Sequence, residues 1–179
     1  SKTAPNGSWH KLERGEVSLD AGWFQAFNRD LRDPKKWGDF WTLAMTKEGK
    51  EVGEIPPIPE VDGEWMFWDM MSTARAPDPW MWPAVQNLKA SGRYIVAALS
   101  NTIIFPPDHP YGQPAKSSIR RSFDIFISSA HVGLRKPDPR IYELALQEVK
   151  KYAKEHAATK GKGLGWADGI TPDDVVFLD

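Results

Sequence analysis

The chain has 179 residues, of which 41% are hydrophobic, enough for one sizeable core with a small accessory domain. A formal net charge of -1 without long basic runs argues against a nucleic-acid-binding surface, while a local site for a small anion remains compatible with it. The absence of cysteine excludes disulfides, a thiolate nucleophile and a zinc–thiolate cluster, and no apolar run approaches the roughly 20 residues that cross a bilayer. We expect a soluble cytoplasmic protein without a membrane span.

The distribution of tryptophan divides the sequence. The chain contains nine tryptophans, and all but two of them precede residue 81. Residues 1–82 have an aromatic, helical pattern, and we predict a helical region there. Residues 83–179 alternate apolar strands with amphipathic helices, which is typical of a parallel sheet. The predicted fold class is therefore α/β.

In the first region, Ser18 is predicted to cap a helix that continues to Leu31, because apolar residues recur there at spacings of three and four. The dipeptide Asp33-Pro34 is expected to end that helix and to begin the next turn. Residues 49–63 contain three prolines, which lack an N–H group and restrict the residue before them. We predict an extended loop over this stretch.

The second region is predicted to alternate helices and strands. Proline near the start of a helix and glycine after its end mark two of the helix boundaries. The expected elements, in chain order, are a helix over 83–90 closed by Gly92, strands over 94–99 and 123–128, a helix beginning near Pro139, a loop over 161–169 and a last strand over 175–178.

Polar residues stand at or near the ends of the three predicted strands. Ser100, Ser128 and Asp179 hold these positions, and ligands of open parallel sheets bind beyond the carboxyl ends of the strands. A hydroxyl at Ser100 and the amide of Asn101 can donate to phosphoryl oxygens, and the ammonium group of Lys136 can neutralise their charge. The carboxylate of Asp179 can bind Mg²⁺. Each feature taken alone is also typical of an ordinary turn or helix cap.

Three segments in fixed order resemble the later motifs of the haloacid dehalogenase (HAD) superfamily: Leu99-Ser100-Asn101-Thr102, Arg135-Lys136-Pro137-Asp138-Pro139 and Val175-Val176-Phe177-Leu178-Asp179. With residues 9–18 and 131–142, they are similar to the subgroup that includes the N-terminal phosphatase domain of soluble epoxide hydrolases. The resemblance implies a HAD-like Rossmannoid core with an inserted helical cap. Residues 1–82 would form the cap region, and residues 83–179 would form part of the core.

The resemblance also implies roles for individual residues. Ser100 matches the hydroxyl that hydrogen-bonds the transferring phosphoryl group, and Asn101 beside it matches a supporting contact. Lys136 matches the lysine that balances charge on an aspartyl-phosphate intermediate. Asp179 matches the first acidic residue of the fourth motif, which binds Mg²⁺ or orients its water. Asp124 and Asp138 have no catalytic counterpart, so we expect them to be structural.

The acidic end of the last segment favours one chemistry within the superfamily. Mg²⁺-dependent phosphatases keep an acidic residue after this strand, whereas metal-independent 2-haloacid dehalogenases have a serine- and asparagine-rich segment there. The resemblance therefore implies a phosphatase that attacks a small-molecule phosphate ester with an aspartate and hydrolyses the phosphoaspartate. The tryptophan-rich cap region suggests a partly apolar ester. A 2-haloacid dehalogenase-like hydrolase is an alternative.

The family's first motif, an Asp-x-Asp pair at the end of a strand before the cap, is missing from this sequence. Residues 1–6 offer neither an apolar strand nor a carboxylate, and no later segment substitutes for them. In the family this strand lies between the strands that end at Ser100 and Asp179. We therefore expect the chain as given to be inactive, and to be an interior piece of a longer protein or a chain completed by another segment. A second alternative is a catalytically inactive HAD-like module that binds a partner or an apolar ligand through its aromatic cap.

Overall fold

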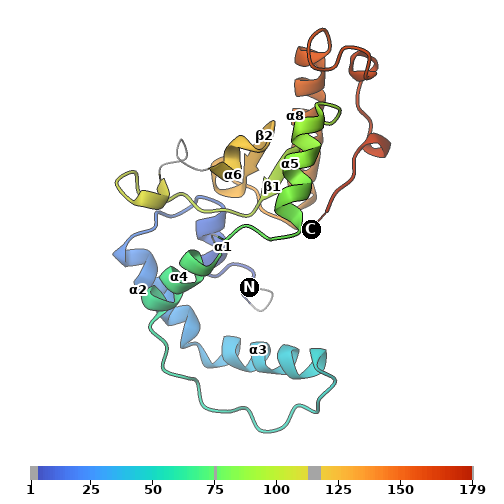
Figure 1. Cartoon of the computed structure of the whole chain (residues 1–179). Helices are drawn as coiled ribbons and strands as arrows, with labels where there is room; N and C mark the ends of the chain where they lie inside the picture. Colours follow the sequence, from blue (N-terminus) through green and yellow to red (C-terminus); the bar gives the residue numbers. More distant parts are fainter. Residues whose placement is uncertain (1–3, 75, 113–117, 179) are drawn as a thin grey trace. The chain divides into compact units, whose positions relative to one another are not determined.

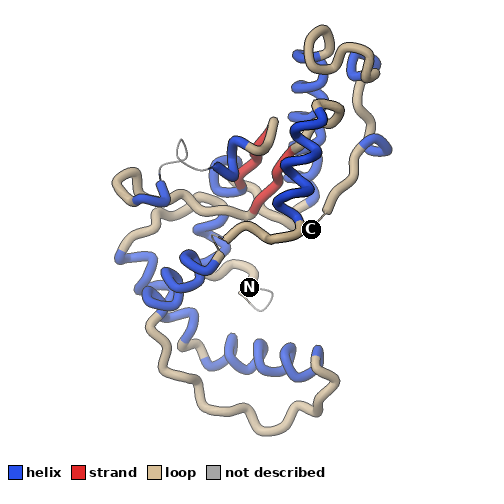
Figure 2. The backbone as a smooth tube through the Cα atoms, viewed as in Figure 1, coloured by secondary structure: helices blue, strands red, loops and turns tan. Residues whose placement is uncertain are grey.

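The computed structural model describes residues 4–74, 76–112 and 118–178. These residues form a mixed structure in which helices predominate and two parallel strands make a small sheet (Figures 1 and 2). This mixed helix and sheet structure is compatible with the coarse α/β prediction, and the finer prediction of a HAD-like core stays a prediction. The chain divides into two compact units, called unit 1 (residues 1–12 and 16–76) and unit 2 (residues 13–15 and 77–179). In the described part of the chain, no helix is both long enough and apolar enough to cross a membrane.

Unit 1 is helical. Its elements are α1 (Ser8–Glu13, whose last residue belongs to unit 2), α2 (Ala21–Leu31), α3 (Pro34–Lys47) and α4 (Gly63–Thr73). Residues 50–62 contain no helix, which confirms the predicted loop over most of its length. The indole of Trp37 on α3 fixes this loop, since its Nε1 donates to the carbonyl oxygen of Pro56 at 2.8 Å.

The helix boundaries of unit 1 follow from their capping residues. Asp33 accepts hydrogen bonds from the backbone N–H groups of Lys35 and Lys36 at 2.9 and 3.1 Å, so the boundary predicted at Asp33-Pro34 is confirmed, and the residues after it form the helix α3 where a turn was predicted. The prediction for α2 was wrong by two residues. Asp20, not Ser18, is the cap, because its carboxylate lies 2.9 Å from the backbone nitrogen of Trp23 and satisfies an N–H group that has no partner within the helix.

Aromatic rings form the core of unit 1. Phe67 on α4 is fully buried, and its ring lies 5.2 Å from that of Trp23 on α2 in an edge-to-face arrangement. Trp23 stacks on Phe27 at 4.9 Å and donates from Nε1 to the backbone oxygen of Ser8 at 2.9 Å. Burying the rings while satisfying the indole N–H stabilises the packing of α1, α2 and α4. Part of the tryptophan excess therefore belongs to a core.

Unit 2 contains the sheet. Its elements are α5 (Met81–Ser91), β1 (Ala97–Ser100), the short 3-10 helix η1 (Pro110–Gly112), α6 (Ser118–Arg121), β2 (Ile125–Ser128), α7 (Ser129–Val132), α8 (Pro139–His156), and the 3-10 helices η3 (Trp166–Asp168) and η4 (Pro172–Asp174). Strands β1 and β2 are parallel, with Ala97 opposite Ile125 and Ser100 opposite Ser128. Both predicted strands exist, and both are shorter than predicted. Figure 1 shows α5 and α8 beside them.

The predicted ends of two helices in unit 2 are confirmed. Gly92 closes α5 in the left-handed region at φ 64°, where glycine has no steric penalty. Asp138 caps α8 by accepting from the backbone nitrogen of Arg140 at 3.0 Å, and Pro139 occupies the first turn. Hydrogen bonds from the side chain and backbone of Arg140 lower the pKa of Asp138 to about 2. The expectation that Asp138 is structural agrees with these contacts.

The predicted last strand was wrong. Residues 175–178 pair with no strand in the described part of the chain, and Val176 and Leu178 remain 84% and 71% exposed. An apolar run becomes a strand only where a neighbouring backbone offers hydrogen-bonding groups in register. Because the sheet of unit 2 consists of β1 and β2 with no described strand beside residues 175–178, the segment stays extended without pairing.

Replacing Phe67 tests the aromatic core. Phe67→Ala removes a fully buried ring, and we expect the free energy of unfolding to fall by about 3–5 kcal/mol. Trp65→Ala is the matched control on the same helix, because Trp65 is 65% exposed and its loss is expected to cost less than about 0.5 kcal/mol. Urea unfolding followed by far-UV circular dichroism measures both. Equal losses for the two variants would contradict the assignment of Phe67 to the core.

Candidate functional site

The carboxyl ends of the two strands bring hydroxyl groups together. Ser100 ends β1 and Ser128 ends β2, and the two residues are opposite each other in the register. Ser128 is 5% exposed, whereas Ser100 is half-buried. The Ser100 hydroxyl has no hydrogen-bond partner among the described residues. It is therefore available at the edge of the sheet where parallel folds bind their ligands.

A reciprocal pair of hydrogen bonds joins two of the predicted segments. The side-chain nitrogen of Asn101 donates to the backbone oxygen of Lys136 at 3.1 Å, and the backbone nitrogen of Lys136 donates to the side-chain oxygen of Asn101 at 2.8 Å. These residues are 35 positions apart in the sequence. The amide of Asn101 thus uses both of its polar atoms on the loop that carries Lys136. This arrangement suits a positioning role for Asn101.

Residues 175–178, in the third segment that resembles a HAD motif, contact the loop of Lys136 through the side chain of Phe177. The Lys136 ammonium nitrogen lies 5.4 Å from the centre of the Phe177 ring, within the range of a cation–π contact. The Phe177 ring also packs edge-to-face against Tyr142 on α8 at 5.4 Å. Residues 175–178 therefore approach Lys136 even though they form no strand. The structure brings Ser100, Asn101, Lys136 and Phe177 into one neighbourhood.

The loop that carries Lys136 is anchored a second time, by an ion pair. The Nε atom of Arg135 donates to the Glu13 carboxylate at 2.7 Å, and both side chains are largely buried. The stretch around Glu13 is itself fixed, because Gly15 has a φ of 67° and an added Cβ would lie 2.1 Å from the backbone oxygen of Ala130. Only glycine fits both the conformation and this close approach.

A buried hydroxyl ties these parts together. Ser129, at the start of α7, is fully buried, and its Oγ donates to the backbone oxygens of Glu13 and Thr102 at 2.6 and 3.1 Å. The same Oγ accepts from the backbone nitrogen of Thr102 at 2.9 Å. Ser129 thus links the two strand ends to the segment around residue 13. Sequence reasoning missed Glu13 and Ser129, since no spacing signal pairs residues 116 positions apart.

The described strand ends suit an anion better than a metal ion. They present a hydroxyl, an amide and an ammonium group, which are donors for phosphoryl oxygens. Mg²⁺ instead requires oxygen ligands, above all carboxylates. Within the described ranges, no group of three His, Asp or Glu side chains is arranged to hold a metal ion. Asp179, the predicted Mg²⁺ ligand, lies outside the described residues, so that assignment stays a prediction.

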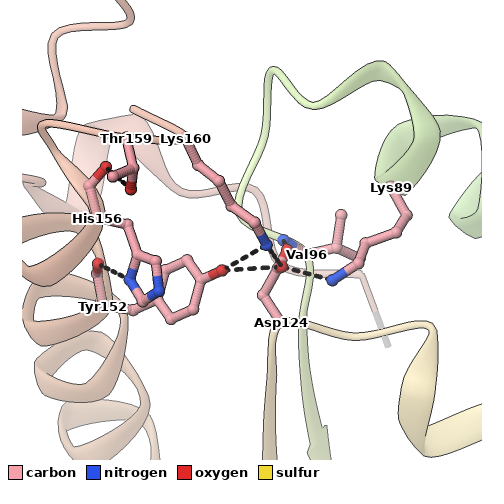
Figure 3. Close-up of polar contacts among 7 residues, drawn as sticks. All are labelled: Lys89, Val96, Asp124, Tyr152, His156, Thr159 and Lys160. Carbon is pink, nitrogen blue, oxygen red and sulfur yellow. Dashed lines mark hydrogen bonds and ion pairs between the residues drawn. The ribbon is translucent and has the colours of Figure 1, made fainter. Parts of the chain in front are cut away.

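Asp124 lies at the other end of the same strands, in a polar cluster (Figure 3). Its carboxylate accepts from the backbone nitrogen of Val96 at 3.0 Å, from the Tyr152 hydroxyl at 3.0 Å and from the Lys160 ammonium at 3.2 Å, and it also pairs with Lys89. Burial raises the pKa of Asp124, but the hydrogen bonds from these partners outweigh burial and lower it to about 2. The expectation that Asp124 is structural agrees with this geometry, which links α5, β1, β2 and α8.

No protein-family model matches this chain, and no curated protein matches it either.

The Asp124 cluster has a testable pH dependence. We expect Asp124→Asn to lower the free energy of unfolding by about 1–3 kcal/mol at pH 7, because a hydrogen-bonded charge is lost. A lowered pKa in the folded state stabilises the protein above the unfolded-state pKa, about 4, and this stabilisation disappears as the pH falls through about 2.

Urea unfolding at several pH values measures this effect. The difference between wild type and Asp124→Asn should shrink steadily below about pH 4. Asp108→Asn is the control, since Asp108 is an exposed loop residue of unit 2 and its replacement should have little effect at any pH. A difference that stays constant from pH 7 to the acid limit would contradict the proposed electrostatic role.

Proposed function

We propose that this chain carries the phosphate-binding part of a HAD-like hydrolase site, of the Mg²⁺-dependent phosphatase kind, and acts on a small phosphate ester. The observation that supports this most strongly is the reciprocal hydrogen-bond pair between Asn101 and Lys136. It holds two segments that resemble separate HAD motifs side by side at the carboxyl ends of parallel strands.

Different residues of the chain have different roles in the proposed binding of a phosphoryl group. The Ser100 hydroxyl donates a hydrogen bond to one phosphoryl oxygen, and the Lys136 ammonium neutralises part of the negative charge. Asn101 touches the loop instead of the ester, so we assign it as a positioning residue. The ion pair between Arg135 and Glu13 also restrains the same loop. Preorganised donors of this kind lose little entropy when the anion binds.

The remaining chemistry requires groups that the described residues do not supply. In the HAD-like reaction, an aspartate oxygen attacks phosphorus while the alcohol leaves, and water then cleaves the phosphoaspartate. The family's Asp-x-Asp motif is not found in the sequence. Bound Mg²⁺ would neutralise phosphoryl charge, and Asp179 is the residue proposed to hold it.

A second candidate is a HAD-like module that binds a phosphorylated ligand without turning it over. It rests on the same reciprocal hydrogen bonds between Asn101 and Lys136, which position the loop for binding without supplying a nucleophile. Both candidates require the same phosphate-binding residues, and they differ in hydrolysis. The chain as given is expected to bind phosphate and to leave p-nitrophenyl phosphate intact in the presence of Mg²⁺.

Binding of inorganic phosphate tests the shared part of the proposal. Isothermal titration calorimetry on the 179-residue chain should show one site, and Lys136→Ala should weaken binding by about 10-fold or more because the charge-assisted contact is lost. Ser100→Ala should weaken it by about 3- to 10-fold, through loss of one hydrogen bond.

The matched control is Lys151→Ala, which removes an exposed lysine from α8 and leaves the net charge equal to that of Lys136→Ala. Its affinity for phosphate should equal that of the wild type. If Lys136→Ala and Lys151→Ala bind phosphate equally well, the strand-end site is wrong. Hydrolysis of p-nitrophenyl phosphate that depends on Lys136 would instead favour a complete enzyme over the binding module.

A further inference from the structure

An imidazole lies at the same strand ends and has no role in the site described so far. His131 is on α7, which begins directly after β2, and its side chain is exposed. Its Nδ1 atom lies 2.8 Å from the hydroxyl oxygen of Ser128. Ser128 in turn is hydrogen-bonded to the hydroxyl of Thr102. Thr102, Ser128 and His131 therefore form a chain of three side chains that we call the hydroxyl–imidazole chain.

The number of available hydrogens indicates which atom donates in each hydrogen bond of the hydroxyl–imidazole chain. If Thr102 donates to Ser128 and Ser128 donates to Nδ1, each hydroxyl hydrogen has an acceptor. If Nδ1 were the donor, Ser128 would accept from the ring, and the Ser128–Thr102 hydrogen bond would use only one of the two hydroxyl hydrogens. The other hydroxyl hydrogen would then have no acceptor among the described residues. The first direction is favoured, and it places the hydrogen of the neutral ring on Nε2.

In this arrangement the His131 ring has a hydrogen-bond donor at Nε2 in both its neutral and its protonated state. The neutral ring carries its hydrogen on Nε2, and the protonated ring carries one on both nitrogens. Because Nδ1 is occupied by Ser128, Nε2 is the ring atom left for a ligand, and it donates in either state. A fixed donor at the carboxyl end of a parallel strand suits an anion. It does not suit a metal ion, which requires an unprotonated ring nitrogen.

Ser128 itself is not suited to nucleophilic attack, although a serine next to a histidine can be activated in that way. Its side chain belongs to a residue that is only 5% exposed, and its oxygen is already bonded to Thr102 and His131. A substrate would have to displace buried hydrogen bonds to reach it. The geometry gives Ser128 the task of holding the ring.

We infer that His131 is a further phosphate-binding residue of the strand-end site, and that it donates from Nε2 to a phosphoryl oxygen in the tautomer held by Ser128 and Thr102. The inference rests on the proposed function, because it adds a donor to the same site. Ser100 and Ser128 lie opposite each other in neighbouring strands, about 5 Å apart across the sheet. An anion bound at Ser100 therefore lies near the end of β2, where Ser128 is hydrogen-bonded to the His131 ring.

Nuclear magnetic resonance of the imidazole nitrogens tests the tautomer in the full 179-residue chain. Two other histidines serve as internal references. His109 accepts a hydrogen bond at Nδ1 from the backbone nitrogen of Tyr111, which requires the hydrogen on Nε2. His156 donates from Nδ1 to the backbone oxygen of Tyr152, which requires the hydrogen on Nδ1. Above the pH of imidazole protonation, His131 should show the pattern of His109.

Titration with inorganic phosphate then tests the contact. The Nε2 signal of His131 should move on saturation, while the signals of His156 stay in place. His131→Asn keeps an amide near the position of Nδ1 and loses the outer donor, so its affinity should fall by about 5- to 10-fold. His131→Gln keeps a donor near the position of Nε2 and should lose less. Because His131 is exposed, both variants should fold.

The outcomes separate this inference from the proposed function. Weaker binding in Lys136→Ala, together with wild-type affinity in His131→Asn and an unmoved Nε2 signal, would overturn the role of His131 and leave the phosphate site standing. A His131 spectrum that matches His156 would overturn the tautomer and with it the inference. If the wild-type chain binds no phosphate, both proposals are wrong.

Discussion

The buried hydroxyl of Ser129 is the contact on which the strand ends of unit 2 depend. Its oxygen accepts from the backbone N–H of Thr102, and its single hydrogen is shared between the carbonyl oxygen of Glu13 and the more distant carbonyl oxygen of Thr102. It fixes the chain after β1, the start of α7 and the segment around residue 13 against one another. A buried hydroxyl that lost these partners would cost the free energy of an unsatisfied polar group. The anchored position of Glu13 in turn places its carboxylate for Arg135, beside Lys136.

The two ends of the sheet carry polar clusters of different kinds. At the amino ends of the strands, Asp124 is surrounded by two lysines, a tyrosine hydroxyl and a backbone N–H, so its charge is balanced inside the protein. At the carboxyl ends, Ser100 keeps its hydroxyl without a partner among the described residues. The first cluster stabilises the fold. The second has donors to offer to a ligand, which agrees with the general placement of sites in parallel sheets.

The sequence allowed prediction of elements whose signals are local. Proline and aspartate at the start of α3 and α8, and glycine after α5, act within one turn of the helix, and all three boundaries were predicted. The cap of α2 was misplaced because two suitable residues, Ser18 and Asp20, lie close together, and only the geometry selects between them. Glu13 and Ser129 were beyond prediction, since their partners are set by tertiary packing over more than a hundred residues. Ser100 and Asn101 were predicted as site residues because they end or follow an apolar run, which forms β1, and Lys136 because its segment resembles a HAD motif; their roles stay predictions.

Residues 175–178 show why an apolar pattern is not enough to define a strand. The run has suitable side chains, but its backbone pairs with no strand in the described part of the chain. Its position is set instead by the Phe177 ring, which contacts Tyr142 on α8 and the ammonium group of Lys136. Side-chain contacts of this kind fix the neighbourhood of a segment without fixing its register, because no ladder of backbone hydrogen bonds selects one alignment over the next. The Phe177 ring thus helps to hold the third segment near the first two, and it lies against the lysine that we propose to bind phosphate. Any anion that pairs with Lys136 has to share its ammonium group with this ring, so the position of Phe177 contributes to the affinity of the proposed site.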